Sequence, residues 1–146
     1  MRILLVAGGW SNEREVSLSG AKGIDQALQE LGHEVVFFDP ALELRELPER
    51  AKTTDFAFLN LHGQPGEDGL LQAMLDQVGL PYQGADSRGS FLALHKNVSK
   101  TLFQQAGMLT PAWEFVPCGW ETAQKLRLPV FVKADTGGSS LDMGRA

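Results

Sequence analysis

The chain has 146 residues, of which 43% are hydrophobic, and a formal net charge of −5. This apolar fraction is typical of a packed globular protein and excludes a disordered tail. The negative charge argues against nucleic acid or an anionic membrane as the main partner. One cysteine, Cys118, excludes an internal disulfide and fits a reducing compartment. The apolar run 3–7 is too short for a signal peptide or a membrane span. We therefore expect a cytoplasmic protein without a membrane segment.

Strand-like and helix-like patterns alternate over the first 84 residues. The continuous apolar run 2–7 predicts a strand that is covered on both faces. A second buried strand is predicted at 34–38 and a third strand at 55–61. Helical spacing of apolar residues predicts two helices: 15–31 and 70–78. A further short helix is predicted within 42–50, before Pro48. This alternation with short links is typical of a parallel α/β sheet.

The pattern changes after Gly84. The predicted elements are one or two helices over 87–106, an extended stretch over 110–116, a short helix over 121–126 and a strand over 128–133. The apolar residues expected to point inward on the helices are Phe91, Leu92, Leu94, Val98, Leu102 and Phe103. We therefore divide the chain into a complete small domain, 1–84, and the start of a second, incomplete domain, 85–146.

The first motif, residues 8–17, joins the first strand to the first helix through two glycines. Its glycines do not fit the dinucleotide-binding fingerprint, because residue 10 is tryptophan and no third glycine falls in register. A carboxylate in such a turn could bind a cationic group, such as a substrate ammonium. The alternative is helix capping by Ser11, Asn12 or Glu13, and this segment alone favours capping.

The second motif, Leu59 to Gly69, carries three glycines, a histidine and two carboxylates where the third strand ends. Polar groups at the carboxyl end of a buried strand are where open α/β sheets bind ligands. The alternative is a strand-to-helix connection in which Glu67 or Asp68 serves as the N-terminal charge of the next helix. Taken alone, the segment slightly favours this structural interpretation.

Lysines and a glycine–serine turn make up the other two motifs. Lys96 and Lys100 share a helix face; we expect Lys100 to be solvated, and Lys96 is the better phosphate partner. Lys133 ends an apolar strand, where we expect it to be half sheltered, and the turn 137–140 offers N–H groups and hydroxyls suited to phosphate. The alternative is a flexible turn with polar decoration. The turn is not a Walker A motif, because no G-K-S or G-K-T occurs.

In this order, the motifs resemble the D-alanine–D-alanine ligase family of ATP-grasp enzymes. The matching segments are 8–17, 62–69, 79–84, Lys96 with Lys100, and 128–133 with 138–140. The match covers nearly the whole chain, and the E-R-E-V-S and H-G-x-x-G-E-D-G elements are specific in combination. The resemblance implies a parallel-sheet, Rossmann-like pre-ATP-grasp domain followed by an incomplete ATP-grasp central domain. The chain departs from the family pattern at Trp10, Ala134 and Gly137.

The resemblance also implies an activity. ATP would phosphorylate the carboxylate of one D-alanine, and the amine of a second would attack the acyl phosphate, for peptidoglycan synthesis. Mg²⁺ would accompany ATP, with its ligands beyond Ala146, so this N-terminal portion would be inactive alone. A homodimer is expected. Two alternatives remain open: a free-standing small-molecule-binding α/β module, and a sibling enzyme such as a D-alanine–D-lactate ligase.

The resemblance assigns roles to particular residues. Glu13 would bind the ammonium of the first D-alanine, Val16 would line that subsite, and His62 would lie beside it. Lys96 and Lys133 would hold the ATP phosphates. Ser139 would lie on a mobile loop over the site and bond toward Glu13 or the substrate, so Glu13 and Ser139 are the predicted catalytic residues.

Overall fold

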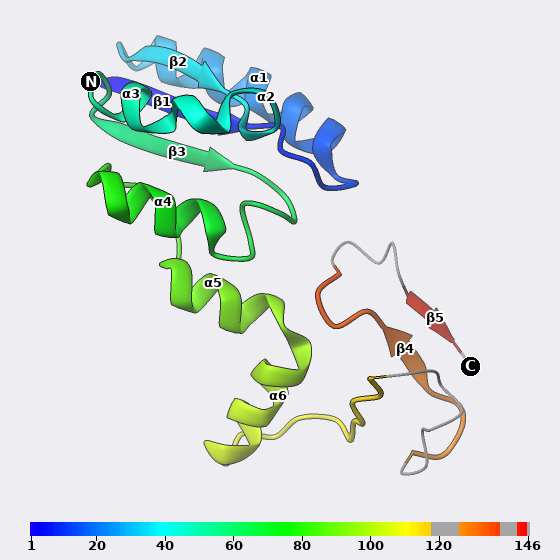
Figure 1. Cartoon of the computed structure of the whole chain (residues 1–146). Coiled ribbons are helices and arrows are strands. Elements are labelled where there is room, and N and C mark those ends of the chain that lie inside the picture. The colour runs from blue at the N-terminus through cyan, green and yellow to red at the C-terminus, as the bar shows by residue number, and fades with distance from the viewer. Residues whose placement is uncertain (118–125, 138–142, 146) are drawn as a thin grey trace. The chain divides into compact units, whose positions relative to one another are not determined.

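The computed structural model describes residues 1–117, 126–137 and 143–145, and these fall into two compact units, 1–91 and 92–146 (Figure 1). We describe each unit by itself. The interpretation of 1–84 as a complete domain and of 85–146 as the start of a central domain stays a prediction.

A parallel three-stranded sheet forms the centre of the first unit (Figure 1). The strands are β1 (Arg2–Ala7), β2 (Glu34–Phe38) and β3 (Phe56–Asn60), in the order β2-β1-β3. In the central strand, Leu4 lies opposite Val36 on one side and Ala57 on the other. Residues 3–7 of β1 are all buried, as expected for a strand covered on both faces. The structure therefore confirms the three predicted strands and the parallel α/β class. The burial predicted for 34–38 is wrong, because β2 lies at the edge of the sheet and is buried only at Phe38.

Helices cover both faces of this sheet. On one face, α1 (Arg14–Glu30) packs through Ala21 against Leu5 of β1. The opposite face is covered by α3 (Leu47–Ala51) and α4 (Leu70–Val78). Their side chains form the larger core with β1 and β2: Leu4, Val6, Phe38, Leu47, Leu71 and Leu75. The two predicted helices at 15–31 and 70–78 are thus confirmed as α1 and α4.

The region after β2 differs from the prediction of one short helix before Pro48. Three short helical segments follow one another: α2 (Pro40–Glu43), the 3₁₀ helix η1 (Leu44–Glu46) and α3. Pro48 lies in the first turn of α3 rather than beyond the end of a helix. Proline is tolerated there because the first N–H groups of a helix have no partner within the helix.

A short segment closes the outer edge of β3. The N–H of Ala57 donates to the carbonyl of Pro81 at 2.8 Å. The Gln83 side-chain amide accepts from Leu59 N at 3.0 Å and donates to Leu59 O at 2.7 Å, which imitates a neighbouring strand. Tyr82 between them donates to Asp76, and burial together with this bond raises the pKa of Tyr82 to about 12. The strand edge is therefore not open to pairing with another chain at this point.

The second unit begins within the helical region predicted for 87–106. That region forms two helices, α5 (Ser87–Leu94) and α6 (Lys96–Gln105), which are separated at His95. Two short antiparallel strands follow, β4 (Phe131–Lys133) and β5 (Met143–Arg145). The strand predicted for 128–133 is therefore shorter than expected, and residues 110–116 form neither helix nor strand. Most of the helix predicted for 121–126 lies outside the described residues, as does Cys118. No helix among the described residues has the length and apolar character needed to cross a membrane.

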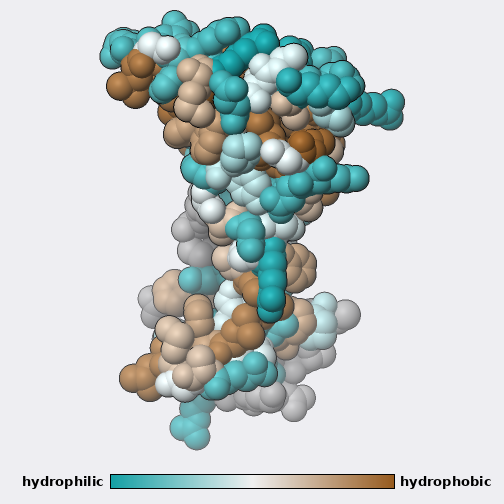
Figure 2. All heavy atoms as spheres, turned by 90° about the vertical axis from the view of Figure 1, so that its left-hand side faces the viewer, coloured by the Kyte–Doolittle hydropathy of each residue, from teal (hydrophilic) through white to brown (hydrophobic). Residues whose placement is uncertain are grey.

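Apolar side chains lie on the surface of the second unit. None of the residues 92–117 and 126–137 is buried, and Figure 2 shows apolar residues exposed in this part of the chain. Leu102 and Phe103, predicted to point inward, are exposed, as is Phe91 at the end of the first unit. Helical spacing identifies an apolar face correctly, but burial also needs a second layer to cover it. The described residues of this unit do not provide such a layer.

Leu70 and Leu71 are adjacent in α4 and offer a matched pair for testing the core of the first unit. The side chain of Leu71 is 0% exposed and that of Leu70 is 44% exposed. We expect Leu71→Ala to lower the free energy of unfolding by about 3 kcal/mol, because it leaves a cavity, and Leu70→Ala by under about 1 kcal/mol. Urea unfolding can be followed through Trp10 fluorescence after Trp113 and Trp120 are replaced by Phe. Equal losses would contradict the assignment of Leu71 to the core.

Candidate functional site

The three parallel strands end at the same edge of the sheet, and polar groups gather there. Gly8 and Gly9 follow β1, Asp39 follows β2, and the segment Leu61–Gly69 follows β3. In open α/β sheets this edge is where ligands bind. The geometry at this edge is set by three groups of hydrogen bonds.

Asp39 is the most buried charged group at this edge, with 2% of its surface exposed. Its carboxylate accepts from Gly9 N at 3.0 Å and from Ala41 N at 2.9 Å, so it caps α2 and holds the turn after β1. Arg14 donates to this carboxylate from both terminal guanidinium nitrogens, Nη1 and Nη2, and Nη1 lies 3.1 Å from Oδ1. Nη1 also donates to Gly9 O at 2.7 Å. Gly8 is needed here: its φ is +95°, and a Cβ would lie 2.6 Å from the Asp39 carboxyl group.

The protonation of Asp39 follows from these contacts. Burial alone would raise its pKa, but Arg14 and the N–H groups of Gly9 and Ala41 outweigh burial, so the pKa lies below the ordinary 3.8. The same hydrogen bond to Asp39 raises the pKa of Arg14. Asp39 is therefore ionised although it is buried, and it holds the turn after β1 and the start of α2 in place. Sequence reasoning assigned no such role to Arg14 or Asp39, although an Asp before a proline is a recognisable helix-cap signal.

Ser17 ties the first helix to two strands. Its hydroxyl accepts from Gly8 N at 2.8 Å and donates to the carbonyl oxygen of Asn60. The Asn60 amide donates in return to Ser17 O at 2.8 Å. Because Ser17 is completely buried, these bonds are shielded from water. Within the E-R-E-V-S motif, Arg14 and Ser17 thus serve the architecture of the sheet edge.

Ser11 brings Glu13 and the His62–Gly63 turn together. The Ser11 hydroxyl donates to His62 O at 2.6 Å and accepts from Glu13 N at 3.1 Å. Gly63 has a φ of +64°, and a Cβ on it would lie 2.8 Å from Ser11 Cβ and 3.7 Å from Glu13 Oε2. The Glu13 carboxylate therefore lies next to this turn.

The capping alternatives have different outcomes at the two motifs. Glu13 is the N-cap residue of α1, but its side chain makes no capping hydrogen bond, so the capping interpretation is wrong for Glu13. Asp68 behaves as the structural alternative predicted, since its Oδ1 accepts from Leu70 N at 3.0 Å at the start of α4. Val16, on the first turn of α1, is 59% exposed and does not belong to the core.

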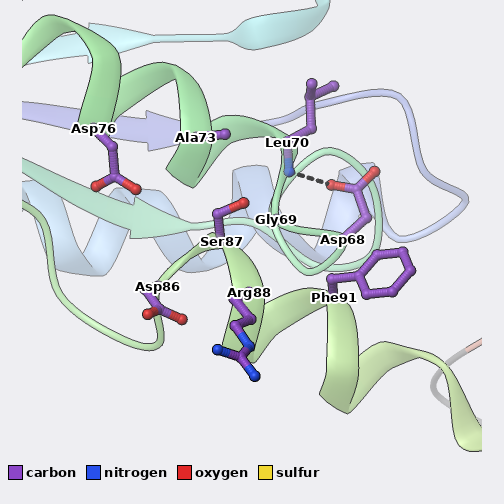
Figure 3. A pocket seen from close by; sticks show the side chains of 9 residues that line it. All are labelled: Asp68, Gly69, Leu70, Ala73, Asp76, Asp86, Ser87, Arg88 and Phe91. Atoms are coloured by element: carbon purple, nitrogen blue, oxygen red, sulfur yellow. Dashed lines mark hydrogen bonds between the residues drawn. The ribbon is translucent and has the colours of Figure 1, made fainter. Parts of the chain in front are cut away.

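A separate open hollow of about 700 Å³ lies where α4 and α5 begin (Figure 3). It is lined by Asp68, Gly69, Leu70, Ala73, Asp76, Asp86, Ser87, Arg88 and Phe91. None of the predicted site residues lines it. We therefore assign it no role in the predicted chemistry.

In the second unit, Lys96 is held against the segment that follows β4. Its Nζ donates to the carbonyl oxygens of Asp135, at 3.3 Å, and of Gly137. The Asp135 carboxylate accepts from Asn97 N at 2.8 Å and lies 3.1 Å from His95 Nδ1. Burial would raise the pKa of Asp135. The backbone N–H of Asn97, the His95 ring and the Lys96 charge outweigh burial and lower this pKa below 3.8. Asp135 is a further site-related residue that sequence reasoning did not find.

The remaining predicted residues are placed as follows. Lys133 ends β4 and is exposed, so the expectation of a half-sheltered lysine is wrong. Lys100 is half-buried and donates to Thr110 Oγ1 at 2.9 Å, so the expectation that it is solvated is also wrong. Ser139 lies outside the described residues, as do its neighbours Gly138 and Ser140. Glu13, Val16 and His62 belong to the first unit, and Lys96 and Lys133 to the second.

No group of three or more His, Cys, Asp or Glu side chains in 1–117, 126–137 and 143–145 could hold a metal ion. We derive no chemical step through magnesium.

Comparison with known proteins places these observations in a family. The family model described as D-ala D-ala ligase N-terminus matches residues 40–85. The D-alanine–D-alanine ligase of Maridesulfovibrio salexigens is 59% identical over 98% of the chain and 48% of the relative. That of a Synechococcus strain is 42% identical over 100% of the chain and 47% of the relative. The chain belongs to the D-alanine–D-alanine ligase family. It spans about half the length of the curated relatives that it matches, and this is their N-terminal half.

Solved structures of the family agree with the fold. A crystal structure of D-alanine–D-alanine ligase from Bacillus anthracis superposes with a TM-score of 0.86 at 33% identity, over the whole chain and 49% of that protein. A second structure of the Bacillus anthracis enzyme, complexed with ATP, has a TM-score of 0.81 at 31% identity, over 50% of that protein. The enzyme from Coxiella burnetii has a TM-score of 0.76 at 25% identity, over 56% of that protein.

The buried Asp39 predicts a specific pH dependence. Because its pKa is lower in the folded chain than the ordinary 3.8, Asp39 adds stability above that value and loses it as pH falls through the folded pKa. We expect Asp39→Asn to lower the free energy of unfolding by about 3 kcal/mol between about pH 5 and pH 8. The difference from the unaltered chain should shrink below about pH 4.

Urea unfolding at a series of pH values measures this difference. The contribution of Asp135, whose pKa is also lowered, is present in both proteins and cancels. If the difference in free energy of unfolding between the two proteins stays constant into strong acid, the Asp39 carboxyl group is not the group that titrates.

Proposed function

We propose that this chain is the substrate-binding N-terminal half of an ATP-dependent ligase that joins two D-alanines through an acyl phosphate, for peptidoglycan synthesis. The observation that carries the proposal is the Glu13 carboxylate, held next to the His62–Gly63 turn at the ligand-binding edge of the sheet. The named relatives and family membership support the same activity.

We propose that Glu13 binds the ammonium group of the first D-alanine. Its carboxylate does not cap α1, and the backbone on both sides of it is fixed by Ser11 and Arg14. A carboxylate that is half-buried and already oriented binds an ammonium more strongly than one on a mobile surface side chain. In this proposal, Val16 lines the subsite with its exposed side chain and His62 lies beside the bound substrate.

We propose that Lys96 and Lys133 bind the phosphates of ATP. Lys96 is joined by hydrogen bonds to the segment that follows Lys133, so both ammonium groups belong to one local assembly. Positive groups of this kind stabilise the charge on a phosphoryl group during its transfer. The Bacillus anthracis structure complexed with ATP supports ATP as the substrate. Ser139 would lie on a loop that closes over the site and keeps water from the acyl phosphate.

The proposal includes three properties of the whole enzyme. Mg²⁺ would accompany ATP, with its ligands beyond Ala146. The enzyme would be a homodimer, and it would work in the cytoplasm. Exposed apolar side chains on the first unit, such as Phe37 and Leu42, are available for contact between two copies.

A chimera tests the activity. We expect the 146-residue chain, joined to the C-terminal half of the Maridesulfovibrio salexigens relative in place of that protein's own N-terminal half, to release phosphate from ATP when D-alanine is present. The reason is that 59% identity over 98% of the chain preserves the contacts between the two halves. Coupled phosphate release and mass spectrometry of D-alanyl-D-alanine measure the product.

The two halves expressed separately are the controls, and each alone should give no product. A folded chimera that binds D-alanine but never releases phosphate would favour the small-molecule-binding module over the ligase. Release of phosphate by the 146-residue chain alone would overturn its assignment as a half-enzyme.

Glu13 and Glu15 form a matched pair for testing the substrate subsite. In the chimera, we expect Glu13→Gln to raise KM for the first D-alanine by about 10- to 100-fold, because it removes a charge-assisted hydrogen bond to the ammonium. Glu15→Gln, on the exposed side of the first turn of α1, should stay within about twofold of the unaltered protein. Steady-state kinetics at varied D-alanine separates the two, and equal effects would remove Glu13 from the subsite.

A further inference from the structure

The N-terminus of α6 has an unusual cap. The N-cap residue, His95, makes no side-chain capping hydrogen bond. The N–H of Asn97 is satisfied instead by Oδ1 of Asp135, which follows 38 residues later in the chain, at 2.8 Å. A cap from a distant segment does more than stabilise the helix end, because it also fixes where that segment lies.

Four further contacts join the same two segments. Asp135 Oδ2 lies 3.1 Å from His95 Nδ1. The carbonyl of Asp135 accepts from the backbone N–H of Lys96 at 3.1 Å and from its Nζ at 3.3 Å. The carbonyl of Gly137 accepts from the same Nζ. The segment 135–137 is therefore attached to the first turn of α6 through both backbone and side chains.

Electrostatics explains why this attachment centres on a carboxylate. Lys96 is the first residue of α6, and a cation is unfavourable at the positive end of the helix dipole. The negative charge of Asp135 compensates the dipole and the lysine together, and its lowered pKa shows that it is ionised at neutral pH. An ammonium has three N–H donors, and two of the acceptors around Lys96 are carbonyls of the attached segment. The direction of the remaining N–H is thus set by where Asp135 holds that segment.

We propose that Asp135 is a positioning residue for nucleotide binding: it fixes the first turn of α6 on the segment 135–137 and so orients the Lys96 ammonium toward the phosphates. This inference rests on the proposed function, in which Lys96 binds ATP. It adds Asp135 to the residues proposed for nucleotide binding. The Asp135 side chain accepts from the backbone N–H of Asn97, and its backbone carbonyl accepts from the Lys96 ammonium.

The test compares Asp135→Ala with Asp135→Asn in the chimera. Asparagine keeps an oxygen that accepts from Asn97 N and an amide that can donate to His95 Nδ1, whereas alanine removes both. We expect Asp135→Ala to raise KM for ATP about tenfold, with KM for D-alanine within about twofold of the unaltered chimera. Asp135→Asn should keep KM for ATP within about threefold. If Asp135→Ala does not fold, Asp135→Ser replaces it, since its shorter side chain cannot reach both partners.

A selective change in KM for ATP, rescued by asparagine, is a result that a purely structural role would not produce. The inference is overturned if a folded, active Asp135→Ala chimera keeps its KM for ATP, if KM rises equally for both substrates, or if asparagine and alanine have equal effects.

Hydrogen exchange separates this inference from the proposed function. In the 146-residue chain, the Asn97 amide should be protected from exchange, and Asp135→Ala should remove the protection while Asp135→Asn keeps it. If the chimera is inactive but the Asn97 amide of the 146-residue chain responds in this way, the proposed function is contradicted and the attachment is not. If the chimera is active but the Asn97 amide of the 146-residue chain does not respond, the inference alone is contradicted.

Discussion

The ion pair between Asp39 and Arg14 is the interaction on which the ligand edge of the first unit depends. A parallel sheet brings three strand ends together, and each turn there leaves backbone groups that need partners. The Asp39 carboxylate accepts hydrogen bonds both from the turn after β1 and from the start of α2. Arg14 in turn donates to the carbonyl of Gly9. A carboxylate this deeply buried is tolerated only with such a complete set of partners. Removing the pair would therefore leave several groups unsatisfied together.

In the proposed function Glu13 binds the substrate, and this architecture explains how other residues fix its backbone. Arg14 bonds to Asp39, and Ser17 bonds to both Gly8 and Asn60, so the first turn of α1 is fixed on two sides. Ser11 then fixes the backbone of Glu13 to that of His62. Ser11, Arg14 and Ser17 therefore make the hydrogen bonds that hold this turn in place, and the Glu13 side chain makes no capping hydrogen bond.

The sequence was sufficient for the sheet and the main helices of the first unit, because burial on two faces produces continuous apolar runs and burial on one face produces a helical stripe. It was insufficient where tertiary context decides. Pro48 can end a helix or begin one, and only the connection into α3 selects the second. Phe103 lies on a correctly identified apolar face, yet is exposed because the described residues do not cover it. Asp39 and Asp135 act through partners 25 and 38 residues away, at Arg14 and Asn97, which no local motif reveals.

The two groups of proposed site residues are held in physically different ways, and this has a consequence for binding. Around Glu13, buried and half-buried hydrogen bonds fix the backbone, so in the proposed function a substrate ammonium would meet a preformed partner. Lys96 is held by neutral carbonyls in a unit whose residues 92–117 and 126–137 are all at least partly exposed. A phosphate oxygen is a stronger acceptor for an ammonium than a carbonyl is. In the proposed function, ATP phosphates would therefore replace the carbonyls as acceptors for the Lys96 ammonium without disrupting a packed core. The Asp135 carboxylate would keep the end of α6 in place during this exchange.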